Sequence, residues 1–157
     1  MRPGISIRRA TTSDTDALVQ LEIDARGDSR GWAETVDWPS VFAEPGAFTY
    51  LAEDDETFGV ITVGSPRDSR YRDGDTGEVL AWYLHPRYWQ QGFGRKLLVH
   101  GLSVIKRRHC EQALIWVPET ADRADASLRS LHFESVHQLP LGDTNLIGFV
   151  LDLTDYF

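Results

Sequence analysis

One segment in the middle of this 157-residue chain constrains the fold more than any other. Residues 78–98 read EVLAWYLHPRYWQQGFGRKLL, and the unbroken apolar run Val79–Leu84 predicts a strand buried on both faces. Pro86 ends this strand, and the Gly92-Phe93-Gly94 loop opens a helix that we expect to extend to His109. A helix start offers N–H groups without helical acceptors and the positive end of the helix dipole. The segment therefore predicts a site for a phosphorylated ligand.

Length, charge and cysteine content narrow the class of protein. A chain of this length fits one core, so residues 1–157 are predicted to form a single domain. The net charge of −8 argues against a nucleic-acid binder that neutralises phosphates. Cys110 is the only cysteine, which excludes an internal disulfide and a cysteine-rich metal site. The N-terminus lacks the apolar run of a signal peptide, and no segment approaches the roughly 20 apolar residues of a membrane span, so we expect a cytoplasmic protein.

Hydrophobic periodicity predicts alternating strands and helices around the central segment, which together indicate an α/β or α+β domain with a mixed sheet. Residues 32–46 fit a short helix interrupted by Pro39. The loop 65–77 carries three arginines and three aspartates, which predicts a solvated loop, and its length leaves open a role as a mobile flap. The expected strands are 5–10, 48–55, 57–64, 79–84, 113–117, 133–139 and 145–153, and the other expected helices are 14–25 and 120–131.

Three families of site use a glycine loop of this kind. A Rossmann dinucleotide site requires a third glycine where this chain has Leu97, and the sequence of a P-loop is absent. The chain resembles instead the GNAT acetyltransferase superfamily, whose motif is Arg/Gln-x-x-Gly-x-Gly/Ala after a strand. Gly92 and Gly94 match this motif, whereas Trp89 replaces its Arg or Gln. The resemblance implies a mixed, mostly antiparallel central sheet flanked by helices.

The resemblance also implies a binding site for acetyl-CoA as co-substrate. Backbone groups of Trp82, Tyr83 and Leu84 would hold the pantetheine arm, while the side chains of Trp82 and Tyr83 are expected to pack in the core. For the Arg95 side chain, contact with phosphate and plain solvation both remain open. The residues implied to wrap the pyrophosphate are Gln90, Gln91, Gly92, Phe93, Gly94 and Arg95.

Glu78 is the leading candidate for a catalytic base. An ammonium acceptor must lose a proton before it attacks a thioester, and a carboxylate on an apolar strand has a raised pKa suited to this task. Histone-acetylating members of the superfamily carry a glutamate base at the corresponding place. A solvated carboxylate at the strand end is the alternative. His85 and Glu119 are predicted to be a turn histidine and a loop carboxylate.

The C-terminal part departs from the superfamily pattern. Many members place Asn-x-x-Ala-x-x-x-Tyr before a Gly-Phe step, and their tyrosine protonates the departing thiolate. Ala124 and Phe133 fit the pattern, but Leu128 occupies the tyrosine position, Ala121 that of the asparagine and His132 that of the glycine. Either water or another residue supplies this proton, or the chain does not catalyse acetyl transfer.

The predicted function is direct acetyl transfer from acetyl-CoA to a primary amine in a ternary complex, without a metal ion. The alternative is a CoA-binding sensor or interaction module without transferase activity, which the residue at position 128 favours. The acidic net charge is a weak indication of a cationic acceptor, either a small molecule or a peptide. A homodimer is compatible with the resemblance.

Overall fold

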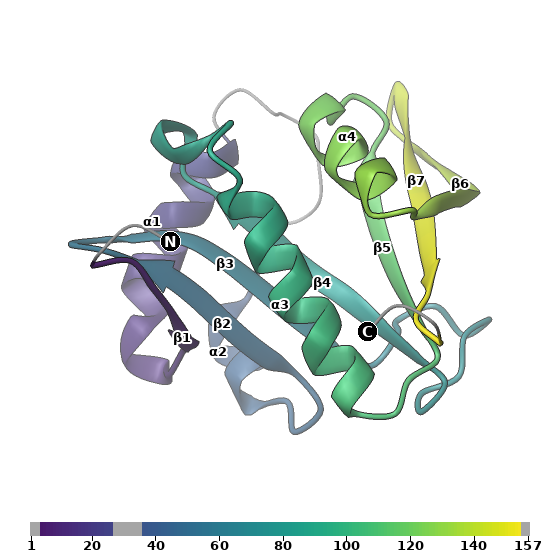
Figure 1. Cartoon of the computed structure of the whole chain (residues 1–157), viewed down its shortest axis with the longest axis horizontal. Coiled ribbons are helices and arrows are strands. Elements are labelled where there is room, and N and C mark those ends of the chain that lie inside the picture. Colours follow the sequence, from purple (N-terminus) through teal and green to yellow (C-terminus); the bar gives the residue numbers. More distant parts are fainter. Residues whose placement is uncertain (1–3, 27–35, 155–157) are drawn as a thin grey trace.

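The computed structural model describes residues 4–26 and 36–154. A seven-stranded sheet with the order β1-β2-β3-β4-β5-β7-β6 forms its centre (Figure 1). Neighbouring strands are antiparallel except β4 and β5, which are parallel. The predicted mixed, mostly antiparallel sheet flanked by helices is thereby confirmed. The strands are β1 (Ser6–Arg9), β2 (Phe48–Glu53), β3 (Thr57–Gly64), β4 (Thr76–Leu84), β5 (Gln112–Pro118), β6 (Glu134–Leu141) and β7 (Thr144–Asp152), and the α-helices are α1 (Thr15–Arg26), α2 (Trp38–Ala43), α3 (Phe93–Arg107) and α4 (Asp122–Ser130).

Helices cover both faces of the sheet. Helix α3 lies across one face, and α1 and α2 lie behind the other (Figure 1). Leu97, Leu98 and Leu102 of α3 are fully buried, which follows from their positions on one side of the helix. Gly101 lets α3 approach β3 closely, because a Cβ at this position would lie 2.6 Å from Cδ1 of Ile61.

Helix α2 begins later than the sequence indicated. It starts at Trp38, and Asp37 caps it by accepting from the backbone N–H of Ser40 at 3.2 Å. Pro39 therefore lies in the first turn, where an N–H has no helical acceptor and its absence costs nothing. The predicted interruption at Pro39 is a helix start, and residues 32–35 of that prediction lie outside the described part of the chain.

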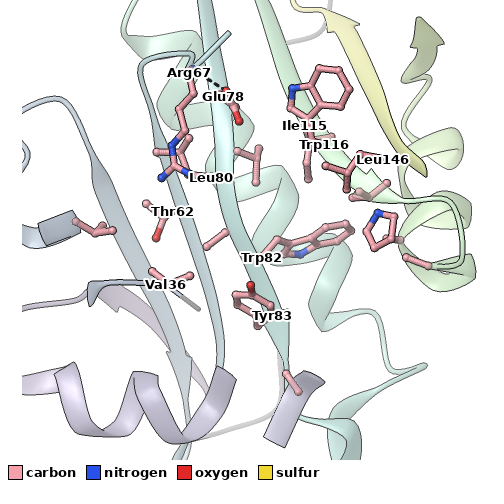
Figure 2. Close-up of a pocket in the computed structure, with 18 of the residues that line it drawn as sticks. Val36, Thr62, Arg67, Glu78, Leu80, Trp82, Tyr83, Ile115, Trp116 and Leu146 are labelled. Carbon is pink, nitrogen blue, oxygen red and sulfur yellow. Dashed lines mark hydrogen bonds between the residues drawn. The ribbon is translucent and has the colours of Figure 1, made fainter. Parts of the chain in front are cut away.

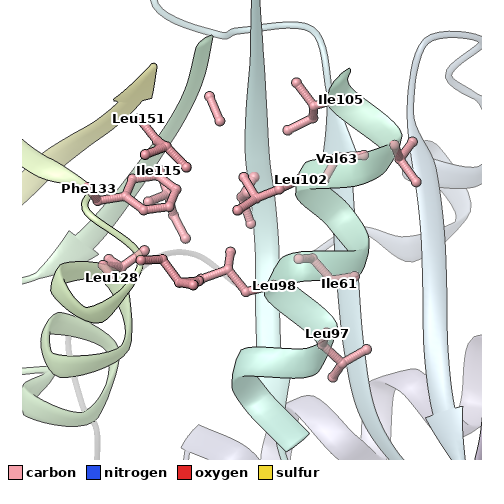
Figure 3. Packing of buried hydrophobic residues seen from close by; sticks show 14 of the residues in the cluster. Ile61, Val63, Leu97, Leu98, Leu102, Ile105, Ile115, Leu128, Phe133 and Leu151 are labelled. Atoms are coloured by element: carbon pink, nitrogen blue, oxygen red, sulfur yellow. The ribbon is translucent and has the colours of Figure 1, made fainter. Parts of the chain in front are cut away.

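Helix α4 presents an apolar residue to the core. Leu128 is fully buried, and Figure 3 shows it pointing toward Leu98 of α3, with Phe133 beside it. The side of α4 that carries Leu128 therefore contributes to packing and brings no hydroxyl group into the interior. Among the helices described, none has both the length and the apolar character needed to cross a membrane.

Candidate active site

A cleft opens where β4 and β5 stop pairing. The two strands pair only over Thr76–Val79 and Gln112–Ile115 and then diverge (Figure 1). The register between β3 and β4 shifts at the same place, because Val63 lies opposite Val79 while Thr62 lies opposite Ala81, and the extra residue Leu80 forms a β-bulge. A cavity of about 640 Å³ occupies the widening gap and extends under α2 (Figure 2).

The backbone edge of β4 faces this cleft. The N–H of His85 donates to a β3 carbonyl at 2.7 Å, and Tyr83 pairs with β3 as well. Because consecutive strand residues direct their backbone groups to opposite edges, Trp82 and Leu84 direct theirs toward the cleft. The carbonyl of Leu84 accepts from Nε1 of Trp89 at 3.0 Å, in agreement with this direction. Trp82 and Leu84 thus offer strand-like groups to an extended ligand, and Tyr83 contributes its side chain.

The glycine loop forms a concave start to α3. Gln90 and Gly92 both have positive φ, of 63° and 87°, and Gly92 is the N-cap of the helix. The N–H groups of Gly94 and Arg95 belong to the first turn, where no earlier helical carbonyl can accept from them. Nε1 of Trp82 donates to the carbonyl of Gly94 at 3.0 Å, which fixes the loop to β4. Such a run of N–H groups at a helix start binds anions.

A cation from a distant element lies over this loop. The guanidinium carbon of Arg123, in the first turn of α4, lies 3.9 Å from the centroid of the Trp89 ring. Position 89 is the one at which the family motif has Arg or Gln. Position 89 itself carries no charge, but the fold stacks the guanidinium of Arg123 on its ring.

Glu78 lies at the other end of the cavity. It pairs with Gly64 on one side and Leu114 on the other, and it is only 6% exposed. Oε1 of Glu78 accepts from the backbone N–H of Arg67 at 2.9 Å. Burial raises the pKa of Glu78 above its ordinary value of 4.5, although the N–H of Arg67 opposes the shift. A buried carboxyl with a raised pKa beside a cavity is the arrangement of a general base.

Comparison with known proteins identifies the family. A sequence profile of the Acetyltransferase (GNAT) family matches residues 15–133, which is more than half of the chain. The chain belongs to this family. The family therefore confirms the resemblance carried by Gly92 and Gly94.

Individual relatives of this GNAT chain differ in their acceptors. The aminoglycoside N(6′)-acetyltransferase type 1 of Stenotrophomonas maltophilia is 26% identical over 136 residues, which cover 85% of this chain and 89% of that protein. The structure of yncA, a putative acetyltransferase from Salmonella typhimurium with its cofactor acetyl-CoA, has a TM-score of 0.78 at 23% identity and covers 97% and 95% of the two chains. The ribosomal-protein-S18-alanine N-acetyltransferase of Escherichia coli has a TM-score of 0.75 at 18% identity, with 94% and 93% covered. At these identities the two structures show a shared fold.

The predicted cofactor residues of this GNAT chain lie along one continuous path. Trp82 lines the cavity, Leu84 ends the same strand, and the start of α3 follows after a short turn. Phe93 is buried and packs against Phe58 at a ring distance of 5.2 Å, so its side chain supports the loop from below. The side chain of Gln91 donates to the carbonyl of Arg87 at 3.0 Å, and that of Arg95 is exposed.

The other candidate residues have structural roles. Nδ1 of His85 accepts from the backbone N–H of Arg87 at 3.1 Å and so caps a short turn. Glu119 accepts from the side chains of Thr144 at 2.8 Å and Asn145 at 3.3 Å, which ties the end of β5 to β7. Both agree with the predicted turn histidine and loop carboxylate.

The loop between β3 and β4 is anchored to β6. Nη1 of Arg70 approaches Nδ1 of His137 at 3.2 Å, and the Tyr71 hydroxyl is hydrogen-bonded to Nε2 of the same ring. A guanidinium only donates, so Nδ1 must accept and the ring hydrogen on Nε2 is donated to Tyr71. The His137 ring also stacks on Trp116, which lines the cavity, with centroids 5.7 Å apart. These contacts join the loop to β6 beside one wall of the cavity.

The cavity positions of three side chains could not be read from the sequence. The side chains of Trp82 and Tyr83 pack against the core as expected, but both also line the cavity because β5 leaves β4 beside them. Arg67 lies in a loop with balanced charges, and nothing in its neighbourhood distinguishes it from Arg70 or Arg72. Only the tertiary structure places it on the cavity wall.

Proposed function

We propose that this chain is an N-acetyltransferase that moves acetyl from acetyl-CoA to a primary amine by direct attack in a ternary complex. The observation that carries the proposal is the layout of β4. A helix start of the kind that binds phosphate lies beyond one end of this strand, and the buried carboxyl of Glu78 lies near the other end, beside the cavity. An extended thioester lying along the strand would present its acyl group near the base.

The residues present fit acetyl-CoA as co-substrate. The first-turn N–H groups of Gly94 and Arg95 and the positive-φ loop at Gln90 and Gly92 would hold the pyrophosphate. The guanidinium of Arg123 would supply the charge that Trp89 cannot. Backbone groups of Trp82 and Leu84 would pair with the amides of the pantetheine arm, as an added strand does. Tyr83 belongs to this set through its side chain.

Glu78 would act as the base, directly or through a water molecule. The acceptor ammonium loses a proton to the carboxylate, and the neutral nitrogen then attacks the thioester carbonyl carbon. The C–N bond forms, the C–S bond breaks, and the thiolate leaves and takes up a proton. Holding both substrates in one cavity supplies much of the rate through proximity.

Tyr83 would protonate the departing thiolate. Leu128 is buried in the core and has no hydroxyl, so α4 does not perform this role. The Tyr83 hydroxyl points along β4 toward the end that carries Glu78 (Figure 2). It therefore lies on the stretch of strand where the sulfur would sit.

The decisive experiment measures release of the CoA thiol with a panel of amines. An N-acetyltransferase releases CoA at a rate that depends on the acceptor, and the acetylated amine is found by mass spectrometry. Binding of acetyl-CoA by calorimetry without amine-dependent CoA release, for every amine tested, would support a binding module and overturn the proposal.

The acceptor class of the relatives widens the panel. The panel includes aminoglycosides, because the Stenotrophomonas maltophilia relative is an aminoglycoside acetyltransferase. It also includes N-terminal peptides of proteins, because the Escherichia coli neighbour acetylates a ribosomal protein. A cytoplasmic location remains a prediction from the sequence, and a homodimer remains a prediction from the family.

A further inference from the structure

An arginine side chain lies on the wall of the proposed acceptor cavity, beside the proposed base. Arg67 lines the cavity beside Glu78, and within residues 4–26 and 36–154 its guanidinium makes no hydrogen bond or ion pair. Figure 2 shows the side chain folded back along the sheet toward Leu80 and Thr62 instead of extending away from the cavity. The neighbouring Asp68 does not neutralise it, because that carboxylate is paired with Arg70 at 2.6 Å.

Glu78 attracts this guanidinium electrostatically, but no hydrogen bond or ion pair joins the two side chains. Arg67 is the one cation among the described lining residues, and the acids are Glu78, Asp37 and Glu44. Asp37 is occupied by capping α2, and it and Glu44 are exposed at the rim. A planar guanidinium forms its strongest contacts with carboxylates, which it binds through two parallel hydrogen bonds. An acceptor that brings its own carboxylate would supply the missing partner.

The position of Arg67 relative to the base limits the shape of such an acceptor. The N–H of Arg67 itself donates to Glu78, so the cation and the base are attached at the same point of the fold. An acceptor that reaches both must carry its amine and its carboxylate close together. The remaining wall is apolar and aromatic, with Val41, Trp116 and Leu146 among its residues. It fits an apolar group attached near the same carbon.

We infer that the acceptor is an α-amino acid with an apolar side chain, whose carboxylate binds Arg67 while its amine faces Glu78. This inference rests on the proposed acetyl transfer and names its substrate class. A polycationic acceptor, such as an aminoglycoside, would place an ammonium group beside the guanidinium of Arg67, and the two like charges would repel.

The test compares acceptors that differ only in the carboxylate. Leucine is paired with 3-methylbutylamine, phenylalanine with phenethylamine and tryptophan with tryptamine, and kcat/KM is measured for each. A bidentate contact to a charged group corresponds to a preference of about 10- to 100-fold for the amino acid of each pair. Kanamycin is included as a polycationic acceptor and should be a poorer substrate than leucine.

Two variants connect the preference to Arg67. Arg67→Gln keeps the backbone N–H that holds Glu78, and it should lower kcat/KM for leucine to near the value for 3-methylbutylamine. Arg72→Gln is the matched control, because Arg72 belongs to the same loop, is 87% exposed and lies outside the cavity lining. It should keep the preference.

The outcomes separate the inference from the function on which it rests. Equal rates for amino acid and amine, or a preference for kanamycin, would overturn the inference and leave acetyl transfer standing. A carboxylate preference that survives Arg67→Gln would also overturn it. If no acceptor of either kind causes CoA release, the proposed function fails and the inference fails with it.

Discussion

The backbone N–H of Arg67 donates to Oε1 of Glu78 at 2.9 Å, so the loop between β3 and β4 meets the strand at a buried carboxyl. The N–H holds one carboxylate oxygen, and the cavity lies beside the same side chain. The loop is held in turn by Arg70 and Tyr71 on His137. The position of the proposed base therefore depends on a contact between β6 and the loop as well as on β4.

Replacement of Glu78 by Gln tests its role as the base. We expect kcat to fall by about 100- to 10,000-fold, because the acceptor ammonium loses its proton acceptor. In a plot of wild-type kcat against pH, the rate should fall on the acid side with an apparent pKa above the ordinary carboxyl value of 4.5, because burial raises the pKa of Glu78. The variant should not show this fall. A variant that retains both the rate and the fall on the acid side would place the base elsewhere.

The same substitution should affect stability in a pH-dependent way. A raised pKa in the folded state means that the Glu78 contribution to stability is complete below 4.5 and is lost as pH rises through the folded value. Glu78→Gln carries no charge, so it should be more stable than the wild type at neutral pH, and this advantage should shrink as pH falls toward 4.5. Thermal unfolding from pH 4 to 8 measures it. A wild type that gains stability over Glu78→Gln with rising pH would contradict the expectation.

The glycine loop can be tested with a matched pair of glycines. Gly92 and Gly74 have φ of 87° and 99°, and no atom lies within 4 Å of a Cβ at either one. Alanine at either position should therefore cost about 1 to 2 kcal/mol of unfolding free energy through backbone strain alone. Only Gly92→Ala should also weaken acetyl-CoA binding, measured by calorimetry, because it distorts the N–H groups at the start of α3. Equal binding by the two variants would show that the loop does not hold the pyrophosphate.

The central segment was predictable because its signals are local. An apolar run, Pro86 and the glycines at 92 and 94 determine strand, turn and helix start within a few residues of one another. The apolar periodicity of α3 is equally local. These elements account for the correct family and for the location of the proposed cofactor site.

The cavity was not predictable because it depends on where pairing stops. The apolar run of β4 continues unchanged past Val79, yet β5 leaves it there and turns Trp82 into a cavity residue. The bulge at Leu80 is a property of the register with β3, and the contact of Arg123 with Trp89 joins residues 34 positions apart in sequence. No pattern within either segment indicates such a contact.

Arg123 should contribute to cofactor affinity although it lies on α4. Arg123→Gln should raise the Kd of acetyl-CoA by about 10-fold or more, the usual effect of losing a charged hydrogen bond. Trp89→Arg in the same variant restores the residue of the family motif and should recover most of the affinity. Arg129→Gln is the control, because Arg129 lies in the last turn of the same helix and pairs with Asp125 at 3.0 Å. If Arg123→Gln leaves the Kd of acetyl-CoA unchanged, the contact of Arg123 with Trp89 serves packing and does not contribute to cofactor binding.

Tyr83 should be the residue that replaces the missing tyrosine of α4. Tyr83→Phe removes only the hydroxyl, so we expect kcat to fall by about 100-fold, near the lower end of the range for an acid catalyst, while the KM for acetyl-CoA stays close to wild type. Tyr50→Phe provides the comparison, because Tyr50 lies on β2 with its ring against His100 at 4.5 Å and outside the cavity. Steady-state kinetics with a saturating amine measures both variants. If Tyr83→Phe keeps the wild-type kcat, the thiolate takes its proton from water, and neither Leu128 nor Tyr83 has a part in that step.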